Sequence, residues 1–144
     1  MNNNMRTLLL TFFLCFPILA TAQDTSWKAS SSADTLKNSF TVDQSFIALG
    51  QKTFESNCKT CHGKKGKGNG PAAIALNPRP ANLQSKFVQN ESEGALYWKI
   101  STGRKGMPSW KKSLSKKQKW AVITYIRSLT QSNEDLLTKN KNND

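Results

Sequence analysis

Apolar residues in the middle of the chain recur with the spacing of a helix face. Between Asp43, a residue type that caps helix N-termini, and Asn57, they fall on one side of a helix. Gly50 interrupts this helix, although a glycine inside a helix costs about 1 kcal/mol relative to alanine. Because this cost needs a structural reason, we expect another helix to approach closely at Gly50.

A second helix is predicted towards the C-terminus. The segment Ser115-Lys116-Lys117-Gln118 has the pattern of a capping box, in which the first and last side chains bind each other's backbone N–H groups. Val122, Ile126 and Leu129 follow at positions i, i+4 and i+7, so they share one face. The segment is therefore predicted to be an amphipathic helix that reaches Leu129.

The stretch between these two helices has weaker signals. Asn90 and Glu93 form another candidate capping box, ahead of apolar residues that would continue a helix. Residues 63–89 are predicted to be loop, with one short helix near 72–76. Five prolines and eight glycines disfavour long strands. The predicted fold class is all-α.

The beginning of the chain has the features of a signal peptide. Arg6 is its only charge, the run from Leu8 to Ala20 is mostly apolar, and Ala20-Thr21-Ala22 has the small residues of a cleavage site. An uncleaved N-terminal anchor is the alternative, although the apolar run is shorter than the ~20 residues of a membrane-spanning helix. The chain is therefore expected to be exported.

Composition divides the chain into four parts. A spacer rich in Ser, Thr, Ala and Asp follows the leader, and we expect it to be disordered because it lacks a clear apolar period. The polar C-terminal tail resembles it. The predicted parts are a signal peptide at 1–22, the spacer at 23–42, one folded domain at 43–130 and the tail at 131–144.

The chain is also small and basic. It has 144 residues, with 21 Lys and Arg against 9 Asp and Glu, a net charge of +12, and only 37% of hydrophobic residue types. This composition excludes a multi-pass membrane protein and leaves little apolar side chain for a large core. A disulfide, metal or cofactor often stabilises such a domain. The three cysteines and the single histidine are the candidates to hold it.

The segment Cys58-Lys59-Thr60-Cys61-His62 is a C-x-x-C-H motif, which is typical of covalent attachment of a c-type haem. Two thiols three positions apart reach the two vinyl groups on one edge of the porphyrin, and the imidazole that follows becomes an axial ligand of the iron. Three other interpretations compete with haem attachment. A thioredoxin-like redox pair requires a βαβ setting, which does not surround this motif, and structural zinc requires a fourth ligand, which the chain without its leader does not have. A plain disulfide remains an alternative, because an exported protein permits it.

The second axial ligand is predicted by elimination. Without the leader, the chain has no histidine other than His62 and no methionine other than Met107. Gly106 and Pro108 flank Met107 and keep it off a regular helix, as a ligand on a loop requires. The alternative is a methionine that only fills the core. His/Met ligation fills both axial positions and raises the reduction potential, which suits electron transfer.

With these motifs in order, the chain resembles the single-haem class I cytochromes c of the small bacterial periplasmic kind, over about residues 43–130. The resemblance implies a fold with roughly three to five helices around one covalently bound haem c, whose N- and C-terminal helices cross. Gly50, Phe54 and Tyr125 are the candidates for that crossing. The segments that carry the resemblance are 46–54, 58–62, 63–71, 77–83, 106–110 and 119–129.

The resemblance also implies roles for individual residues. Cys58 and Cys61 bind the haem covalently, while His62 and Met107 ligate the iron. Four further residues complete the implied pocket. They are Pro71, whose carbonyl accepts the imidazole N–H; Arg79, near a haem propionate; and Trp98 and Trp110, along the haem edge.

The predicted function is one-electron transfer by an exported cytochrome whose iron cycles between Fe(II) and Fe(III), without enzymatic chemistry. The alternatives are a haem subunit or module of a respiratory or periplasmic enzyme complex, and a ligand-sensing or peroxidatic haem protein. The expected location is the bacterial periplasm or the outer face of the inner membrane.

Lysines and arginines near the two ligand loops predict redox partners with acidic docking patches. The alternatives are a merely solvated face and weak association with an anionic membrane surface. No nucleic-acid motif is present, so nucleic acid is not an expected partner. The basic residues concerned are Lys59, Lys64, Lys65, Lys67, Arg104, Lys105, Lys111 and Lys112.

Overall fold

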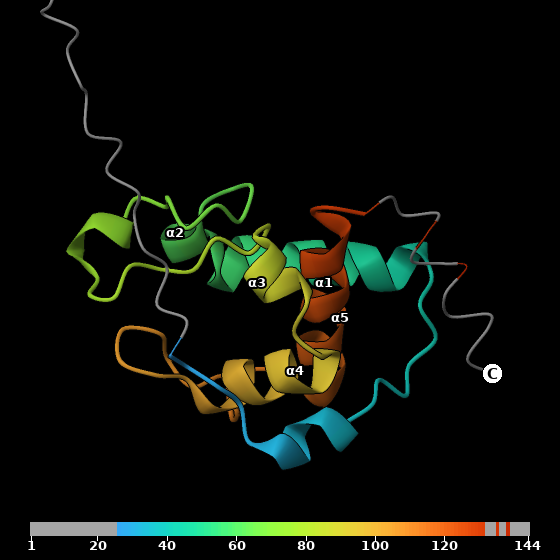
Figure 1. Cartoon of the computed structure of the whole chain (residues 1–144). Helices are drawn as coiled ribbons and strands as arrows, with labels where there is room; N and C mark the ends of the chain where they lie inside the picture. The colour runs from blue at the N-terminus through green and yellow to red at the C-terminus, as the bar shows by residue number, and fades with distance from the viewer. Residues whose placement is uncertain (1–25, 132–134, 136–137, 139–144) are drawn as a thin grey trace, which may run out of the picture.

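The computed structural model describes residues 26–131, 135 and 138 (Figure 1). The predicted signal peptide and most of the polar tail lie outside these residues. Within them the fold is all-α, as predicted, and the only β-type pairing is an isolated bridge. The elements are, in order, η2 (Ser31–Thr35), α1 (Gln44–Asn57), α2 (Lys59–His62), η3 (Ala73–Ala75), α3 (Lys86–Gln89), α4 (Glu93–Thr102) and α5 (Lys116–Ser128).

Helices α1 and α5 cross at Gly50, which confirms the expected close approach (Figure 1). A Cβ atom at Gly50 would collide with the backbone carbonyl of Ala121 and would crowd the Cβ of Tyr125. The rings of Phe54 and Tyr125 lie 5.3 Å apart beside this point. The glycine therefore allows the two backbones to meet, and the aromatic pair packs next to the contact.

The predicted caps of α1 and α5 are confirmed, but that of α4 is wrong by two residues. The Asp43 carboxylate accepts the N–H of Phe46 at 2.7 Å, and Ser115 and Gln118 form the complete capping box. At α4 the cap is Ser92, whose hydroxyl accepts the N–H of Ala95 at 3.0 Å. A serine cap satisfies the first-turn N–H as well as an asparagine cap, so local pattern did not distinguish them.

The one short helix expected within 63–89 is present as η3. Helix α3, at the end of the same segment, was not predicted. Buried Arg127 of α5 fixes the end of α3, because its guanidinium donates to the carbonyls of Val88 and Gln89 at 3.1 Å and to that of Glu91. Burial lowers the pKa of this guanidinium, while the charges of Glu93 and Glu91 oppose the shift. A contact between distant segments therefore stabilises this single turn.

The expectation of a disordered spacer at 23–42 is wrong for residues 26–42, which pack against the domain. Ala33 is buried in η2, and a Cβ at Gly94 of α4 would collide with its carbonyl. The hydroxyl of Ser92 hydrogen-bonds to the Asp34 carboxylate. The sequence shows no apolar period here because single residues, rather than a helix face, make the contacts. We call residues 26–42 the N-terminal strap.

Within the described part of the chain, no helix combines the length and apolar character that crossing a bilayer requires.

Candidate functional site

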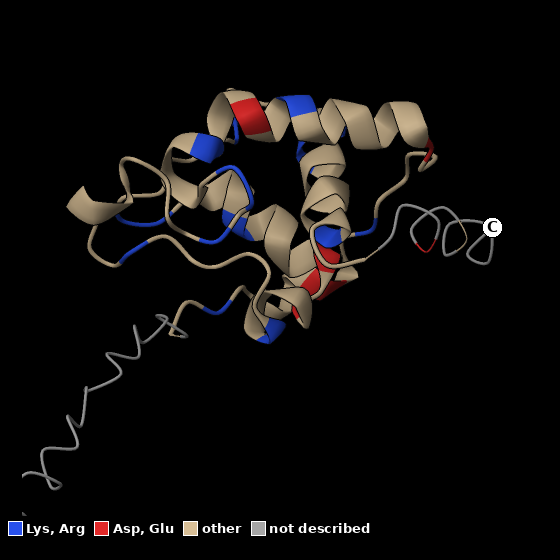
Figure 2. Ribbon diagram, turned by 90° about the horizontal axis from the view of Figure 1, so that it is seen from above, with Lys and Arg blue, Asp and Glu red and all other residues tan. Residues whose placement is uncertain are grey.

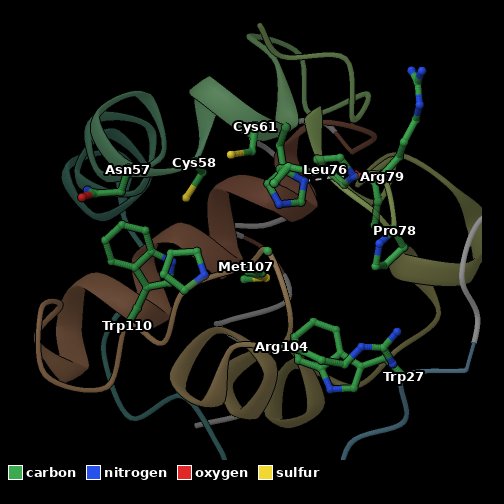
Figure 3. Close-up of a pocket in the computed structure, with 15 residues that line it drawn as sticks. Trp27, Asn57, Cys58, Cys61, Leu76, Pro78, Arg79, Arg104, Met107 and Trp110 are labelled. Atoms are coloured by element: carbon green, nitrogen blue, oxygen red, sulfur yellow. Dashed lines mark hydrogen bonds between the residues drawn. The ribbon is translucent and has the colours of Figure 1, made fainter. Parts of the chain in front are cut away.

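The C-x-x-C-H motif lies where α1 ends and α2 begins. Cys58 is the C-cap residue of α1 and also the N-cap residue of α2. The backbone N–H groups of Cys61 and His62 donate to its carbonyl at 3.2 and 2.9 Å. In this tight turn the sulfur atoms of Cys58 and Cys61 point towards the same cavity (Figure 3). The two thiols are not joined in a disulfide.

His62 is oriented by a backbone carbonyl, but not by the one predicted. Its Nδ1 lies 3.0 Å from the carbonyl oxygen of Ala81. The carbonyl of Pro71 was expected there, but Pro71 lines a separate surface pocket among lysines. The correct residue lies in the 77–83 segment, which the sequence analysis had recognised without assigning this contact. With Nδ1 engaged, Nε2 is the ring nitrogen left for a ligand bond.

Burial changes the protonation of two groups in the motif. It lowers the pKa of His62, although the Ala81 carbonyl opposes the shift, and thereby favours the neutral imidazole that binds metals. It raises the pKa of the Cys58 thiol to about 12, and the nearby Cys61 adds to the shift. Cys58, Cys61 and His62 are half-buried at the cavity, whereas Lys59 and Thr60 of the same motif are exposed to solvent.

Met107 is presented by a tight turn between α4 and α5. Arg104 and Met107 exchange two backbone hydrogen bonds of 2.9 and 3.0 Å, and Gly103 enters the turn with a φ of +68°. The turn is anchored to α4, because the backbone N–H of Trp110 donates to the carbonyl of Ile100 and the hydroxyl of Ser109 donates to the carbonyl of Ser101. Met107 is therefore held on a fixed loop that lines the same cavity as the two thiols (Figure 3).

Two adjoining cavities share Trp27, Cys58, His62, Met107 and Trp110 in their walls, and we call them together the central cavity. Buried core residues form much of the remaining wall. They include Phe54 of α1, Leu96 and Ile100 of α4, and Val122 and Ile126 of α5.

The central cavity fits a covalently bound haem. Protein cores are normally close-packed, so a cavity with apolar walls in the middle of one is suited to an apolar group. Its walls also carry two thiols, an imidazole and a thioether, which is the donor set for haem attachment and axial ligation. Among the described residues, no group of three His, Cys, Asp or Glu side chains is arranged to hold a metal ion.

The other predicted pocket residues have different outcomes. Trp110 lines both parts of the central cavity. Arg79 lines one part, but it is exposed and its guanidinium extends away from the cavity (Figure 3). Trp98 is not among the lining residues; its ring packs instead on Trp27, with centroids 6.4 Å apart.

Sequence reasoning missed Trp27 and Lys99 at the cavity. Trp27 belongs to the segment expected to be disordered, and its only signal was a lone tryptophan in a Ser-rich stretch. Lys99 lines the cavity, is buried and forms an ion pair with Glu91. A lysine inside a helix gives no sequence signal of burial, because the partner charge that permits it lies on another segment.

Comparison with known proteins agrees with this geometry. The profile of the family described as "Cytochrome C oxidase, cbb3-type, subunit III" matches residues 46–126. The cbb3-type cytochrome c oxidase subunit FixP of Bradyrhizobium diazoefficiens is 38% identical over 84 residues, which cover 57% of this chain and 27% of that protein. Subunit CcoP of Azospirillum sp. is 26% identical over 93 residues, with 64% and 31% covered. The chain thus spans about a third or less of these relatives.

The chain is also similar to a cytochrome c6 in sequence and to a protein of known structure. Cytochrome c6 of Tetradesmus obliquus is 29% identical over 80 residues, which cover 56% of this chain and 86% of that protein. A chain of the Kuenenia stuttgartiensis reducing HAO-like protein complex matches with a TM-score of 0.55 and 29% identity, over 67% of this chain and 50% of that chain.

The resemblance to single-haem class I cytochromes c is thereby confirmed, together with the all-α cytochrome c fold. The family and the cytochrome c6 relative indicate that the protein carries covalently bound haem c. With more than half of its length matched by the family profile, the chain belongs to the cbb3-type cytochrome c oxidase subunit III family.

Proposed function

We propose that the central cavity is the haem site, with thioether bonds at Cys58 and Cys61 and axial ligation by His62 and Met107. One observation carries the proposal: the C-x-x-C-H turn and the Met107 loop, 45 residues apart in sequence, line the same cavity. The Ala81 carbonyl holds the imidazole by Nδ1, and the hydrogen-bonded turn at Arg104 holds the thioether. Hydrogen bonds within the chain thus hold both proposed axial ligands in place.

The bound haem iron supplies the chemistry, which is the gain and loss of one electron between Fe(III) and Fe(II). Apolar side chains would surround the haem in this cavity, and His62 and Met107 would both ligate its iron. An iron with no open position does not bind a substrate. We therefore infer that the protein is an electron carrier rather than an enzyme.

Replacing Met107 by leucine tests the axial ligand. The two side chains have similar volumes, so packing is largely kept while the sulfur ligand is lost. The long-wavelength methionine–iron absorption band of the ferric form should disappear, the reduction potential should fall, and the reduced form should bind carbon monoxide. Exposed Ile74 provides the control, since Ile74→Ala should leave all three unchanged.

Two results would reject parts of the proposal. A Met107→Leu protein with the spectrum of the parent would exclude Met107 as ligand. A parent that already binds carbon monoxide when reduced would instead favour the ligand-sensing or peroxidatic alternative.

We further propose that the protein works in the periplasm or at the outer face of the inner membrane, with partners that carry acidic docking patches. The signal-like leader supports export, because cleavage would release the domain on that side. Four lysines support the docking chemistry. They line one surface pocket beside the haem motif and are Lys59, Lys64, Lys65 and Lys67.

The second candidate function is that of a haem subunit in a respiratory oxidase complex. Two relatives named as cbb3-type oxidase subunits support it, although the chain matches only 27% and 31% of their lengths. Purification from membranes under mild detergent distinguishes the two. A stable stoichiometric complex with other haem proteins would favour a subunit, and recovery as a separate protein would favour a free carrier.

A further inference from the structure

We infer that the N-terminal strap is part of the haem site, and that Trp27 is a positioning residue that closes the central cavity on the side of Met107. This inference rests on the proposed haem site. The strap precedes residue 46, where the match to the family profile begins, so its role does not follow from family membership.

Trp27 is fixed at the wall of the cavity from several sides. Its half-buried indole packs on Trp98 at 6.4 Å. Two cations face the ring, since Lys99 Nζ and Arg104 Cζ each lie 5.4 Å from its centroid. A cation over the face of an indole ring is attracted to the negative charge of that face, and more strongly where water is excluded. Such contacts hold an aromatic ring in one place.

The contacts of Trp27 lead directly to the methionine loop. Arg104, which faces the indole, is the residue that exchanges two backbone hydrogen bonds with Met107. Its guanidinium also donates to the hydroxyl of Ser26 at 3.4 Å. Figure 3 shows Trp27 and Arg104 side by side at the edge of the cavity, with Met107 between them and the cysteines. The strap therefore contacts the cavity and the ligand loop at once.

The rest of the strap anchors Trp27 from outside the cavity. Ala33 is 2% exposed against Gly94, whose missing side chain leaves room for the Ala33 carbonyl. Asp34 accepts a hydrogen bond from Ser92, the cap of α4. Phe40 stacks on Phe46 of α1 at 5.9 Å. These contacts hold the strap along α4, so that its first residues reach the cavity.

The Trp27 ring would limit the access of water and of competing ligands to the haem iron. An apolar ring over the cavity keeps the dielectric low and blocks small molecules that would displace the Met107 sulfur. Loss of the ring admits water, which stabilises the charged ferric state and lowers the reduction potential. The strap thus favours methionine ligation and a high potential without contributing a ligand.

Imidazole binding to the ferric holoprotein tests the inference, because imidazole must displace Met107. Trp27→Ala should bind imidazole about tenfold more tightly than the parent, equivalent to about 1.4 kcal/mol, and should have a lower reduction potential. Trp27→Phe, which keeps an aromatic ring, should lie between the two. Leu36→Ala is the control within the strap, since this partly exposed side chain lines neither part of the cavity.

Gly94→Ala tests the same inference without altering the cavity. The added methyl group collides with the Ala33 carbonyl and should detach the strap, so imidazole affinity should again rise. If Trp27→Ala yields no folded holoprotein, Gly94→Ala and Trp27→Phe carry the test.

Unchanged imidazole affinity and potential in both Trp27→Ala and Gly94→Ala would overturn the inference. A parent without a methionine–iron absorption band would instead refute the proposed haem ligands, so the two failures are distinguishable.

Discussion

Single side chains decide several local features of this protein. Asp43 begins α1 by accepting the N–H of Phe46, and its carboxylate also accepts a hydrogen bond from Ser45. These two contacts, with the hydroxyl of Ser45 contributing most, hold the pKa of Asp43 below its ordinary value. The ionised form is therefore the one that caps the helix.

The Asp43 cap predicts a pH dependence of stability. Because the folded-state pKa is lowered, the stabilisation is complete above the ordinary aspartate pKa of ~3.9 and is lost as the pH falls through the folded value. Asp43→Ala should therefore unfold at a lower temperature than the parent at pH 7, and this difference should shrink below pH 4. Thermal unfolding followed by circular dichroism measures it.

Asparagine at this position is the matched control, because it caps a helix but does not titrate. The advantage of Asp43→Asn over Asp43→Ala should be the same at pH 7 and pH 3. A parent that keeps its full advantage over Asp43→Ala at pH 3 would contradict the prediction.

At the scale of elements, the crossing of α1 and α5 connects local sequence to the haem site. The crossing brings together the two longest helices of the described residues and places Phe54 and Val122 on the cavity wall. Further along α1 the chain turns at Cys58 into the haem motif. The position of the motif relative to α5 therefore depends on the fit at Gly50.

Gly50→Ala should destabilise the protein despite the higher helix propensity of alanine. The added methyl group meets the backbone carbonyl of Ala121, which cannot rotate away. Overpacking of this kind typically costs about 1–3 kcal/mol. Chemical denaturation of the holoprotein should show such a fall in the free energy of unfolding.

Lys52→Ala is the control on the same helix, since Lys52 is exposed, and it should change the stability by less than about 0.5 kcal/mol. A Gly50→Ala protein as stable as the parent would mean that the helices cross with more freedom than the structure shows.

At the scale of the whole molecule, positive charge is the dominant surface property. The chain carries a net charge of +12, and Figure 2 shows Lys and Arg on loops as well as helices, with few Asp and Glu among them. Such a field attracts anionic reagents and partners and is screened over about 10 Å at 0.1 M salt. Electron transfer should therefore depend on the charge of the partner.

Two small redox reagents of opposite charge test this dependence. The rate constant for oxidation by the hexacyanoferrate anion should fall with added salt, whereas that for the hexaammineruthenium cation should rise. Lys64→Glu, in the lysine pocket beside the motif, should slow the anion reaction more than Lys52→Glu does, because Lys52 lies outside that pocket. Equal effects of the two substitutions would indicate net charge alone, and salt-independent rates would refute electrostatic steering.

Local sequence was sufficient for much of this protein. The capping residues Asp43 and Ser115 and the glycine at the crossing follow from backbone requirements that a short segment expresses by itself. The C-x-x-C-H motif does so as well, because its spacing matches the chemistry of attachment. These features led to the all-α fold and to haem c.

Only the tertiary structure decided which residues complete the site. Ala81 orients His62 through a backbone carbonyl, and a carbonyl has no residue type that a sequence pattern can reveal. Trp27 reaches the cavity because Ala33 fits against Gly94, two segments that are far apart along the chain. Such contacts depend on the shape of a distant surface, and that shape exists only once the chain has folded.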